Sequence, residues 1–172
     1  MALVALAAVV AAGCSSTETV TTTVPVTTLP ATSDLGPPRQ RLEFGHIKSL
    51  TRKGGRYELR WDPAEFLSGE TANLAAAQDG AVEPGEPVPN DNYVVDESHR
   101  VYTYFVRPSA KVTVLTNKKN GILDTPVSVA QLASLVQGKK VPGVKLYEPL
   151  DSGIWLTTDI DTVTGIQQQY RP

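Results

Sequence analysis

An uncharged apolar run that ends at the only cysteine of the chain limits most strongly how this sequence can fold. Ala2–Gly13 holds only apolar or small residues, and Cys14 follows it directly. A helix that crosses a bilayer needs about 20 apolar residues, whereas the apolar part of an export signal needs about 7–15. The run therefore predicts an export signal, and a folded core has to come from the residues that follow it.

The residues around Cys14 resemble the lipobox of bacterial lipoproteins, in which the cysteine is lipidated and becomes the mature N-terminus. Ala11–Gly13 are small, and the polar stretch Ser15–Thr19 cannot continue an apolar element, which argues against a buried strand. The resemblance implies a protein held at the extracytoplasmic face of the cell membrane by a lipid on Cys14. An ordinary cleaved signal with a chance cysteine is the alternative. Because export signals usually begin with basic residues and none precedes this run, we expect the natural chain to start upstream of Met1.

Residues 15–38 predict a disordered tether between the signal (1–14) and a single domain at 39–172. The stretch from Ser15 to Asp34 holds eight threonines and two prolines, with two acids and no base. Such a composition buries too little apolar surface to offset its ordering entropy. The alternative is a β-strand at Thr19–Val26, where β-branched residues are frequent.

The predicted domain is large enough for a core of its own and is electrically neutral. It holds 134 residues, and a chain of this size buries about two-thirds of its surface on folding. Of the 18 acidic residues, Glu18 and Asp34 precede the domain, while all 16 basic residues belong to it, so its net charge is 0. Nucleic acid and anionic lipid headgroups are therefore not predicted partners, because binding to them depends on a basic excess.

Alternating apolar and polar residues predict a β-hairpin at the start of the domain. Leu42–Leu50 and Arg56–Trp61 alternate on either side of a Gly pair. Within the first segment, Gly45 predicts a bulge or a close approach of another backbone. Asp62-Pro63 is typical of a helix start, so a helical turn is expected at Ala64–Leu67.

Later segments predict further strands and two helices. Ser128 and Gln131 match the capping box that begins a helix, and Pro108 predicts a turn between two strands. The expected helices are Glu70–Asp79 and Val129–Gln137, and the expected strands are Arg100–Arg107, Lys111–Leu115, Val144–Tyr147, Ile154–Thr158 and Val163–Tyr170. Together the segments predict an α+β domain: a mainly antiparallel sheet of about seven strands, able to curl into a small barrel, with two short helices.

Several short strings in a fixed order resemble those of uncharacterised secreted or lipid-anchored proteins of actinobacteria and related Gram-positive bacteria. The strings are Glu65–Glu70, Ala75–Gly80, Pro89–Val95 and Gly153–Tyr170. The resemblance implies export. It supplies no established activity and no catalytic residue.

An acidic and amide cluster is the first candidate for chemistry. Its members are Asn90, Asp91, Asn92, Asp96 and Glu97. Their side-chain oxygens are of the kind that Ca²⁺ binds, but the same residue types cap turns. The turn interpretation is favoured and no metal site is predicted, because the spacing matches no calcium-binding loop.

A histidine beside two acids is the second candidate. His99 could act as a general base oriented by Asp96 or Glu97, as in an envelope hydrolase. A surface histidine that enters a strand is the simpler interpretation. The sequence patterns of a serine nucleophile, a phosphate loop and a dinucleotide site are absent from the sequence, so neither an enzyme nor a cofactor is predicted.

Aromatic residues complete the candidates, because aromatics on a sheet beside an acidic loop can form a sugar- or peptide-binding face. Core packing is the simpler alternative for them. They are Tyr93, Tyr102, Tyr104, Tyr147 and Trp155. We expect a lipid-anchored binding or protein-interaction module of the cell envelope, acting on an envelope protein or a small ligand. The predicted ligand-binding residues are Asn90, Asp91, Asn92, Tyr93, His99, Tyr102 and Tyr104.

Overall fold

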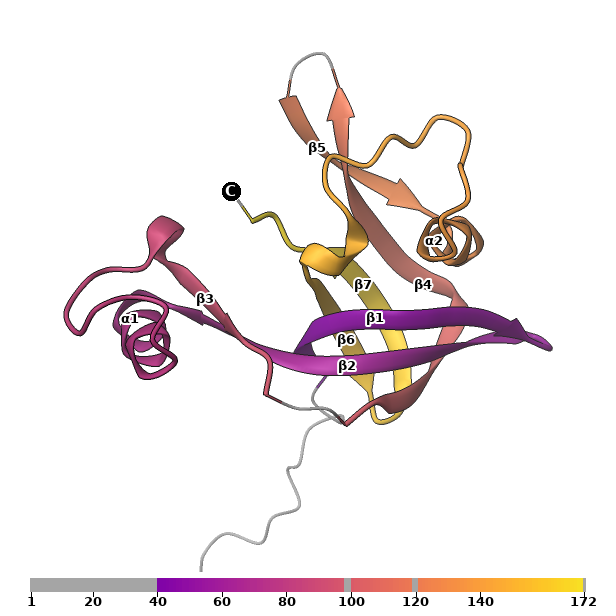
Figure 1. Ribbon diagram of the computed structural model, residues 1–172. Helices are drawn as coiled ribbons and strands as arrows, with labels where there is room; N and C mark the ends of the chain where they lie inside the picture. Colours follow the sequence, from indigo (N-terminus) through magenta and orange to yellow (C-terminus); the bar gives the residue numbers. More distant parts are fainter. Residues whose placement is uncertain (1–39, 98–99, 119–120, 172) are drawn as a thin grey trace, which may run out of the picture. The chain divides into compact units, whose positions relative to one another are not determined.

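The β-hairpin predicted at the start of the domain is confirmed, and both of its strands are longer than their sequence patterns (Figure 1). The computed structural model describes residues 40–97, 100–118 and 121–171. Strand β1 (Arg41–Lys53) and strand β2 (Arg56–Ser68) pair antiparallel around the Gly pair. The predictions for the signal, for Cys14 and for the tether fall outside the described residues.

Gly45 in β1 is a point of close approach, as its place in the sequence predicts. A Cβ atom built on it would lie 2.9 Å from the Cα atom of Pro63 and from Cζ2 of Trp61, and closer still to the carbonyl oxygen of Asp62. All three neighbours belong to β2, which pairs with β1 here. Glycine is therefore the residue that fits without movement of the backbone.

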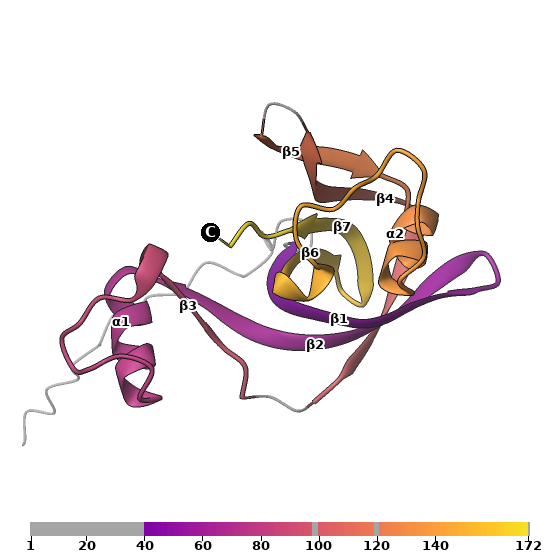
Figure 2. The same ribbon diagram turned by 45° about the horizontal axis from the view of Figure 1, so that its top comes forward.

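Five strands form a closed barrel (Figures 1 and 2). Beside the hairpin these are β4 (Tyr102–Lys118), β6 (Ile154–Asp159) and β7 (Thr162–Gln168). The order is β2-β1-β6-β7-β4, and pairing of β4 with β2 closes the ring. The predicted α+β class with a small barrel is confirmed. The prediction of a mainly antiparallel sheet is only partly right, because β4 and β7 run parallel and the sheet is mixed.

Three local predictions are wrong. The helical turn expected at Ala64–Leu67 is part of β2, because these residues pair with β1 and β3 instead. The turn expected at Pro108 is absent, and β4 continues through it. Val144–Tyr147 is not a strand, since Val144 and Leu146 make isolated bridges there.

Two further strands extend the sheet beyond the barrel. Strand β3 (Asn92–Val95) pairs with the end of β2, and β5 (Gly121–Val127) pairs with β4. Helix α1 (Gly69–Gln78) and the 3-10 turn η1 (Pro89–Asp91) connect β2 to β3. They form a small apolar cluster of their own around Ala72, Ala76 and Val88.

Helix α2 (Val129–Val136) begins at the predicted capping box. The backbone N–H of Gln131 donates to Ser128 Oγ at 3.2 Å, and the backbone N–H of Ser128 donates to Gln131 Oε1 at 2.8 Å. The helix packs against β1 and β4, and the short turn η2 (Leu150–Ser152) leads from the segment after it into β6. The fully buried core of the barrel includes Leu50, Leu59, Trp61, Val106, Val114, Leu132, Ile154, Leu156 and Val163.

This connectivity is that of the OB-fold, a five-stranded Greek-key barrel. The strands β1, β2 and β4 follow one another around the ring, and β6 and β7 return to pair with β1 and β4. Such a fold determines which strands are neighbours and does not by itself determine a function.

Candidate functional site

The predicted ligand-binding residues do not form one site. Tyr93 in β3 pairs with Leu67, whereas Tyr102 in β4 pairs with Trp61 of the same strand β2. Trp61 and Leu67 are six positions apart on that extended strand, which corresponds to about 20 Å. His99 lies outside the described residues.

The stretch from Asn90 to Tyr93 shapes a turn and ties β3 to α1. Asn90 (φ 61°) and Asp91 (φ 54°) are left-handed, a conformation in which Asn and Asp are tolerated best. Asn92 Nδ2 donates to the carbonyl oxygen of Asn90 at 2.8 Å. The Tyr93 hydroxyl donates to Asp79 Oδ2 at 3.0 Å, and this hydrogen bond raises the pKa of Tyr93. Among the described residues, no group of three or more His, Cys, Asp or Glu is placed to hold a metal ion.

Tyr104 is a structural tie across the barrel, while Tyr102 is exposed. The Tyr104 hydroxyl donates to Glu43 Oε2 at 2.9 Å, and Thr158 Oγ1 donates to Glu43 Oε1 at 3.2 Å. Burial and the hydrogen bond to Glu43 raise the pKa of Tyr104 to about 12. Both oxygens of the Glu43 carboxylate thus accept hydrogen bonds from within the protein, one of them from Tyr104.

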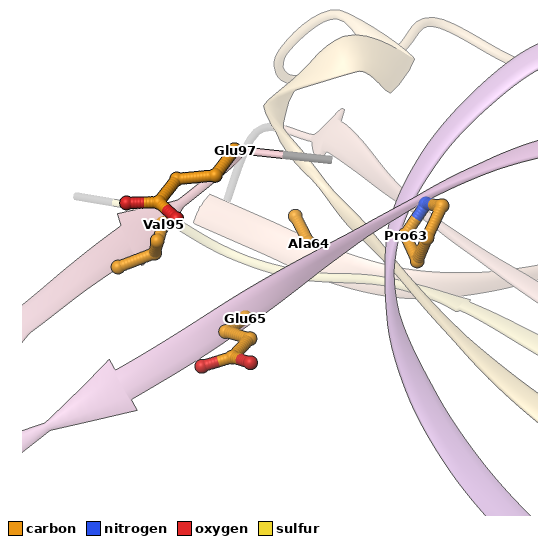
Figure 3. Close-up of a pocket in the computed structure, with 5 residues that line it drawn as sticks. All are labelled: Pro63, Ala64, Glu65, Val95 and Glu97. Carbon is orange, nitrogen blue, oxygen red and sulfur yellow. The ribbon is translucent and has the colours of Figure 1, made fainter. Parts of the chain in front are cut away.

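The acids that precede His99 in the sequence make separate contacts. Asp96 Oδ2 lies 3.9 Å from His46 Nε2. Glu97 and Glu65 line a hollow of about 510 Å³ beside β2. Figure 3 shows that their two carboxylates point in different directions. Asp96 and Glu97 therefore have different neighbours in the described part of the chain.

A groove of about 430 Å³ lies on the outside of the barrel, and we call it the Trp155 groove. Two adjacent rows of cross-strand partners run across β1, β6, β7 and β4 at this place. The first row is Leu42, Thr157, Gly165 and Lys111. The second row is Phe44, Trp155, Gln167 and Thr113. Because side chains alternate along each strand, both rows share one face of the sheet.

Gly165 lines the groove and lies close to the side chain of Thr157. A Cβ atom at this position would lie 3.0 Å from Thr157 Oγ1 and 3.1 Å from Thr157 Cβ. Its cross-strand neighbours are Thr157 on one side and Lys111 on the other. The missing side chain therefore leaves room for the side chain of Thr157 in the middle of the first row.

The indole of Trp155 is held in place by its neighbours. Its ring centroid lies 5.0 Å from that of Phe44 and 5.8 Å from that of Phe66, with the rings edge to face. The indole N–H donates to Gln169 Oε1 at 2.7 Å. An aromatic wall fixed in this way loses little conformational entropy when a ligand packs against it.

Apart from Leu42 and Ile166, the other side chains that line the groove are polar, and most of them are uncharged. Its volume falls in the range of small-molecule sites, about 300–1,000 Å³. Among the described residues that line it, Lys111 is the only charged one. Hydroxyl and amide groups, which both donate and accept hydrogen bonds, come from Thr113, Thr157, Thr164, Gln40 and Gln167.

Sequence reasoning named Trp155 among the aromatic candidates but left it out of the predicted ligand-binding residues, and it missed the partners of Trp155. Thr157, Gly165 and Lys111 reach the groove from three strands, and their meeting depends on register rather than on local pattern. One usable signal was present. A glycine inside a strand, such as Gly165, often marks the close approach of a ligand or of another backbone.

Comparison with known proteins gives no indication of function, so the groove is the main evidence for one. No family model, no curated protein and no solved structure matches this chain. In the residues that the structure covers, no helix combines the length and the apolar character needed to cross a membrane. Function has to be argued from the chemistry of the site.

Proposed function

We propose that this protein is a binding module of the cell envelope, anchored by a lipid on Cys14 at the extracytoplasmic face of the membrane, and that its Trp155 groove binds a neutral saccharide. The observation that carries the ligand class is a fixed indole beside hydroxyl and amide groups in one groove. The anchor and the location rest on the lipobox-like sequence and on the resemblance to exported proteins.

A saccharide matches both parts of the groove. A pyranose ring presents an apolar C–H face, against which an aromatic ring packs, and hydroxyl groups, with which Thr and Gln side chains exchange hydrogen bonds. A wholly apolar ligand would leave those polar groups unpaired, at a cost of about 1–3 kcal/mol each. A polyanion would meet a single lining cation, Lys111.

The fold alone would point to a different face. OB-folds bind oligosaccharides and oligonucleotides mostly on their second and third strands, which correspond to β2 and β4 here. The Trp155 groove is centred on β6 and β7. The proposal therefore rests on the chemistry of the groove.

Two other interpretations stay predictions. The envelope hydrolase requires His99, which lies outside the described residues, together with Asp96 or Glu97. Asp96 faces His46 instead. The second interpretation is an envelope protein as the partner, which needs no groove. The same experiment decides between the two ligand classes, because a saccharide that binds would identify the class directly.

The test is a titration of the full chain, carrying Cys14→Ser to keep it free of lipid, with chitotetraose, cellotetraose and maltotetraose. Tryptophan fluorescence and amide NMR signals follow binding. At least one of the three should bind and shift the signals of Trp155 and Gly165. Trp155→Ala should weaken binding about tenfold or more, because the loss of about 100 Å² of apolar contact corresponds to roughly 2 kcal/mol. Gly165→Val places a side chain against Thr157 in the groove and should abolish binding, and urea unfolding of the same variant checks that it still folds.

Tyr102→Ala is the matched control, because it removes an exposed aromatic side chain that does not line the groove. It should bind as the wild type does. Absence of binding by all three sugars, or undiminished binding by Trp155→Ala, would refute the saccharide. The anchor is tested separately in cells: Cys14→Ala should move the protein from the membrane fraction to the soluble fraction, and a variant that stays with the membrane overturns it.

A further inference from the structure

A second groove, of about 590 Å³, lies between the C-terminal end of α2 and the segment that follows it. We call it the lysine groove. Leu135 from the helix lines it together with apolar side chains of the next segment, Val141, Pro142, Val144 and Leu146. It shares no lining residue with the Trp155 groove.

The lysine groove is formed by a segment that is hydrogen-bonded to the barrel. The backbone N–H of Asn117 in β4 donates to the carbonyl oxygen of Lys145 at 3.1 Å, and that of Tyr147 donates to the carbonyl oxygen of Leu115 at 2.9 Å. A tight turn closes the other end, where the Val144 N–H donates to the carbonyl oxygen of Val141 at 3.1 Å. Figures 1 and 2 show this segment running from α2 past the β4–β5 pair. The groove is thus largely preformed.

Lys139, Lys140 and Lys145 also line the groove. No Asp or Glu is among the described residues of its lining, and none of the ion pairs found in the described part of the chain involves these lysines. The helix end does not need them, because the backbone N–H groups of Gln137, Gly138 and Lys139 already close the last turn. The three ammonium groups therefore give this groove a positive field of its own in a domain that is neutral as a whole.

Apart from the exposed Pro142, the apolar side chains of the groove are buried or partly buried. Val141 is buried, and Leu135, Val144 and Leu146 are partly buried, whereas the three lysines are exposed. The flat surface of a bilayer would meet the lysines and Pro142 and would not reach the buried side chain of Val141. A single alkyl chain is narrow enough to lie along the groove while its head group stays at the lysines.

We propose that the lysine groove binds one molecule of a single-chain anionic amphiphile, its alkyl chain against Leu135, Val141 and Val144 and its carboxylate or phosphate head beside Lys140 and Lys145. This site is independent of the proposed saccharide site and of the lipid anchor. The two parts of the groove stabilise two parts of the ligand. The apolar residues bury methylene groups of the alkyl chain, and the lysines form charge-assisted hydrogen bonds with the head group.

The test uses the full chain carrying Cys14→Ser, titrated below the critical micelle concentration and followed by calorimetry and by amide NMR. Dodecanoate and dodecyl phosphate should bind with one molecule per chain and shift the signals of Gly138 and Gly143. Affinity should rise with chain length from octanoate to dodecanoate, by up to about fourfold for each methylene group. Dodecanol, which lacks the charge, and butyrate, which lacks the chain, should both bind far more weakly.

Two variants separate the two halves. Lys140→Gln combined with Lys145→Gln should weaken dodecanoate binding about three- to tenfold and reduce its salt dependence. The matched control is Arg52→Gln combined with Lys53→Gln, which removes the same charge outside both grooves and should leave binding unchanged. Leu135→Gln makes the floor polar without touching the barrel core and should remove the dependence on chain length.

Three outcomes would overturn the proposal. Dodecanol that binds as tightly as dodecanoate would show that the lysines have no part in recognition. Binding that survives both variants would place the site elsewhere. Binding to anionic phospholipid vesicles without binding to monomeric dodecanoate would make this face a membrane contact and not a pocket for one amphiphile.

Discussion

Gly45→Ala adds one methyl group to β1 at a point where β2 leaves no room for it. The added carbon would lie 2.9 Å from Pro63 Cα and from Trp61 Cζ2, below the distance that Cβ atoms tolerate, with the Asp62 carbonyl oxygen closer still. Two of these three neighbours are backbone atoms, which cannot rotate away. Overpacking costs about 1–3 kcal/mol when side chains can adjust. We expect a loss of about 3 kcal/mol here, larger than the gain of about 0.4–1 kcal/mol from restricting the unfolded chain.

Gly55→Ala is the matched control for this substitution. Nothing lies within 4 Å of its added Cβ atom, and Gly55 is not among the glycines with positive φ. Its effect should stay within about 0.5 kcal/mol. Urea unfolding of the full chain, followed by tryptophan fluorescence, compares the two, and the thermal midpoint of Gly45→Ala should fall by about 10 °C. A Gly45→Ala variant as stable as the wild type, or equal losses in both variants, would refute the argument from close approach.

Three further substitutions test other contacts. Ser128→Ala should lower the free energy of unfolding by about 1 kcal/mol because it removes the hydroxyl that caps α2. Ser134→Ala, which loses only a side-chain hydrogen bond within the helix, should change the free energy little in the same urea titration. The Tyr104 hydroxyl should ionise near pH 12 instead of 10. Its contribution to stability is therefore complete below pH 10 and is lost as the pH rises to about 12. The difference in phenolate absorbance between the wild type and Tyr104→Phe measures this ionisation. Lys48→Met should destabilise the protein, because it leaves the buried carboxylate of Asp62 without the ammonium group 2.6 Å away, and a double-mutant cycle should show a smaller loss when Asp62→Asn is already present.

The elements that sequence reasoning predicted correctly are those specified by near neighbours. The first hairpin follows from alternation on both sides of a Gly pair, and its register needs no other strand. Helix α2 follows from Ser128 and Gln131, which bond to each other across three positions. Such signals are local, so one segment of sequence contains all of the information.

The elements that were mispredicted depend on distant partners. Asp62-Pro63 carries a helix-start signal, yet β2 stays extended there because β1 lies alongside and β3 continues the pairing. Pro108 carries a turn signal, but pairing of β4 with β2 ends at Val106 and pairing with β5 begins at Val112. Pro108 lies between these two paired stretches of β4, so its missing N–H removes no hydrogen bond from either ladder.

For the candidate site too, sequence reasoning found what depends on residue type and missed what depends on distant pairing. Aromatic composition pointed to Trp155, which lines a groove but was not among the predicted ligand-binding residues, and to Tyr104, which was among them and whose hydroxyl donates to Glu43. Nothing in the sequence around Lys111 or Gly165 indicates that they are neighbours, because the parallel pairing of β4 and β7 brings them together. A parallel pair requires a long crossover, and its register is set by the whole barrel.

The hairpin formed by β6 and β7 covers one edge of β1 and one edge of β4. Strand β6 pairs with β1, and strand β7 pairs with β4. A chain that emerges N-terminus first therefore keeps two unpaired strand edges until residues 154–168 are free. Such edges pair readily with other chains, and contacts between distant segments form slowly. Residues 154–168 thus complete the barrel, and a chain cut short before Ile154 is left as an open sheet prone to aggregation.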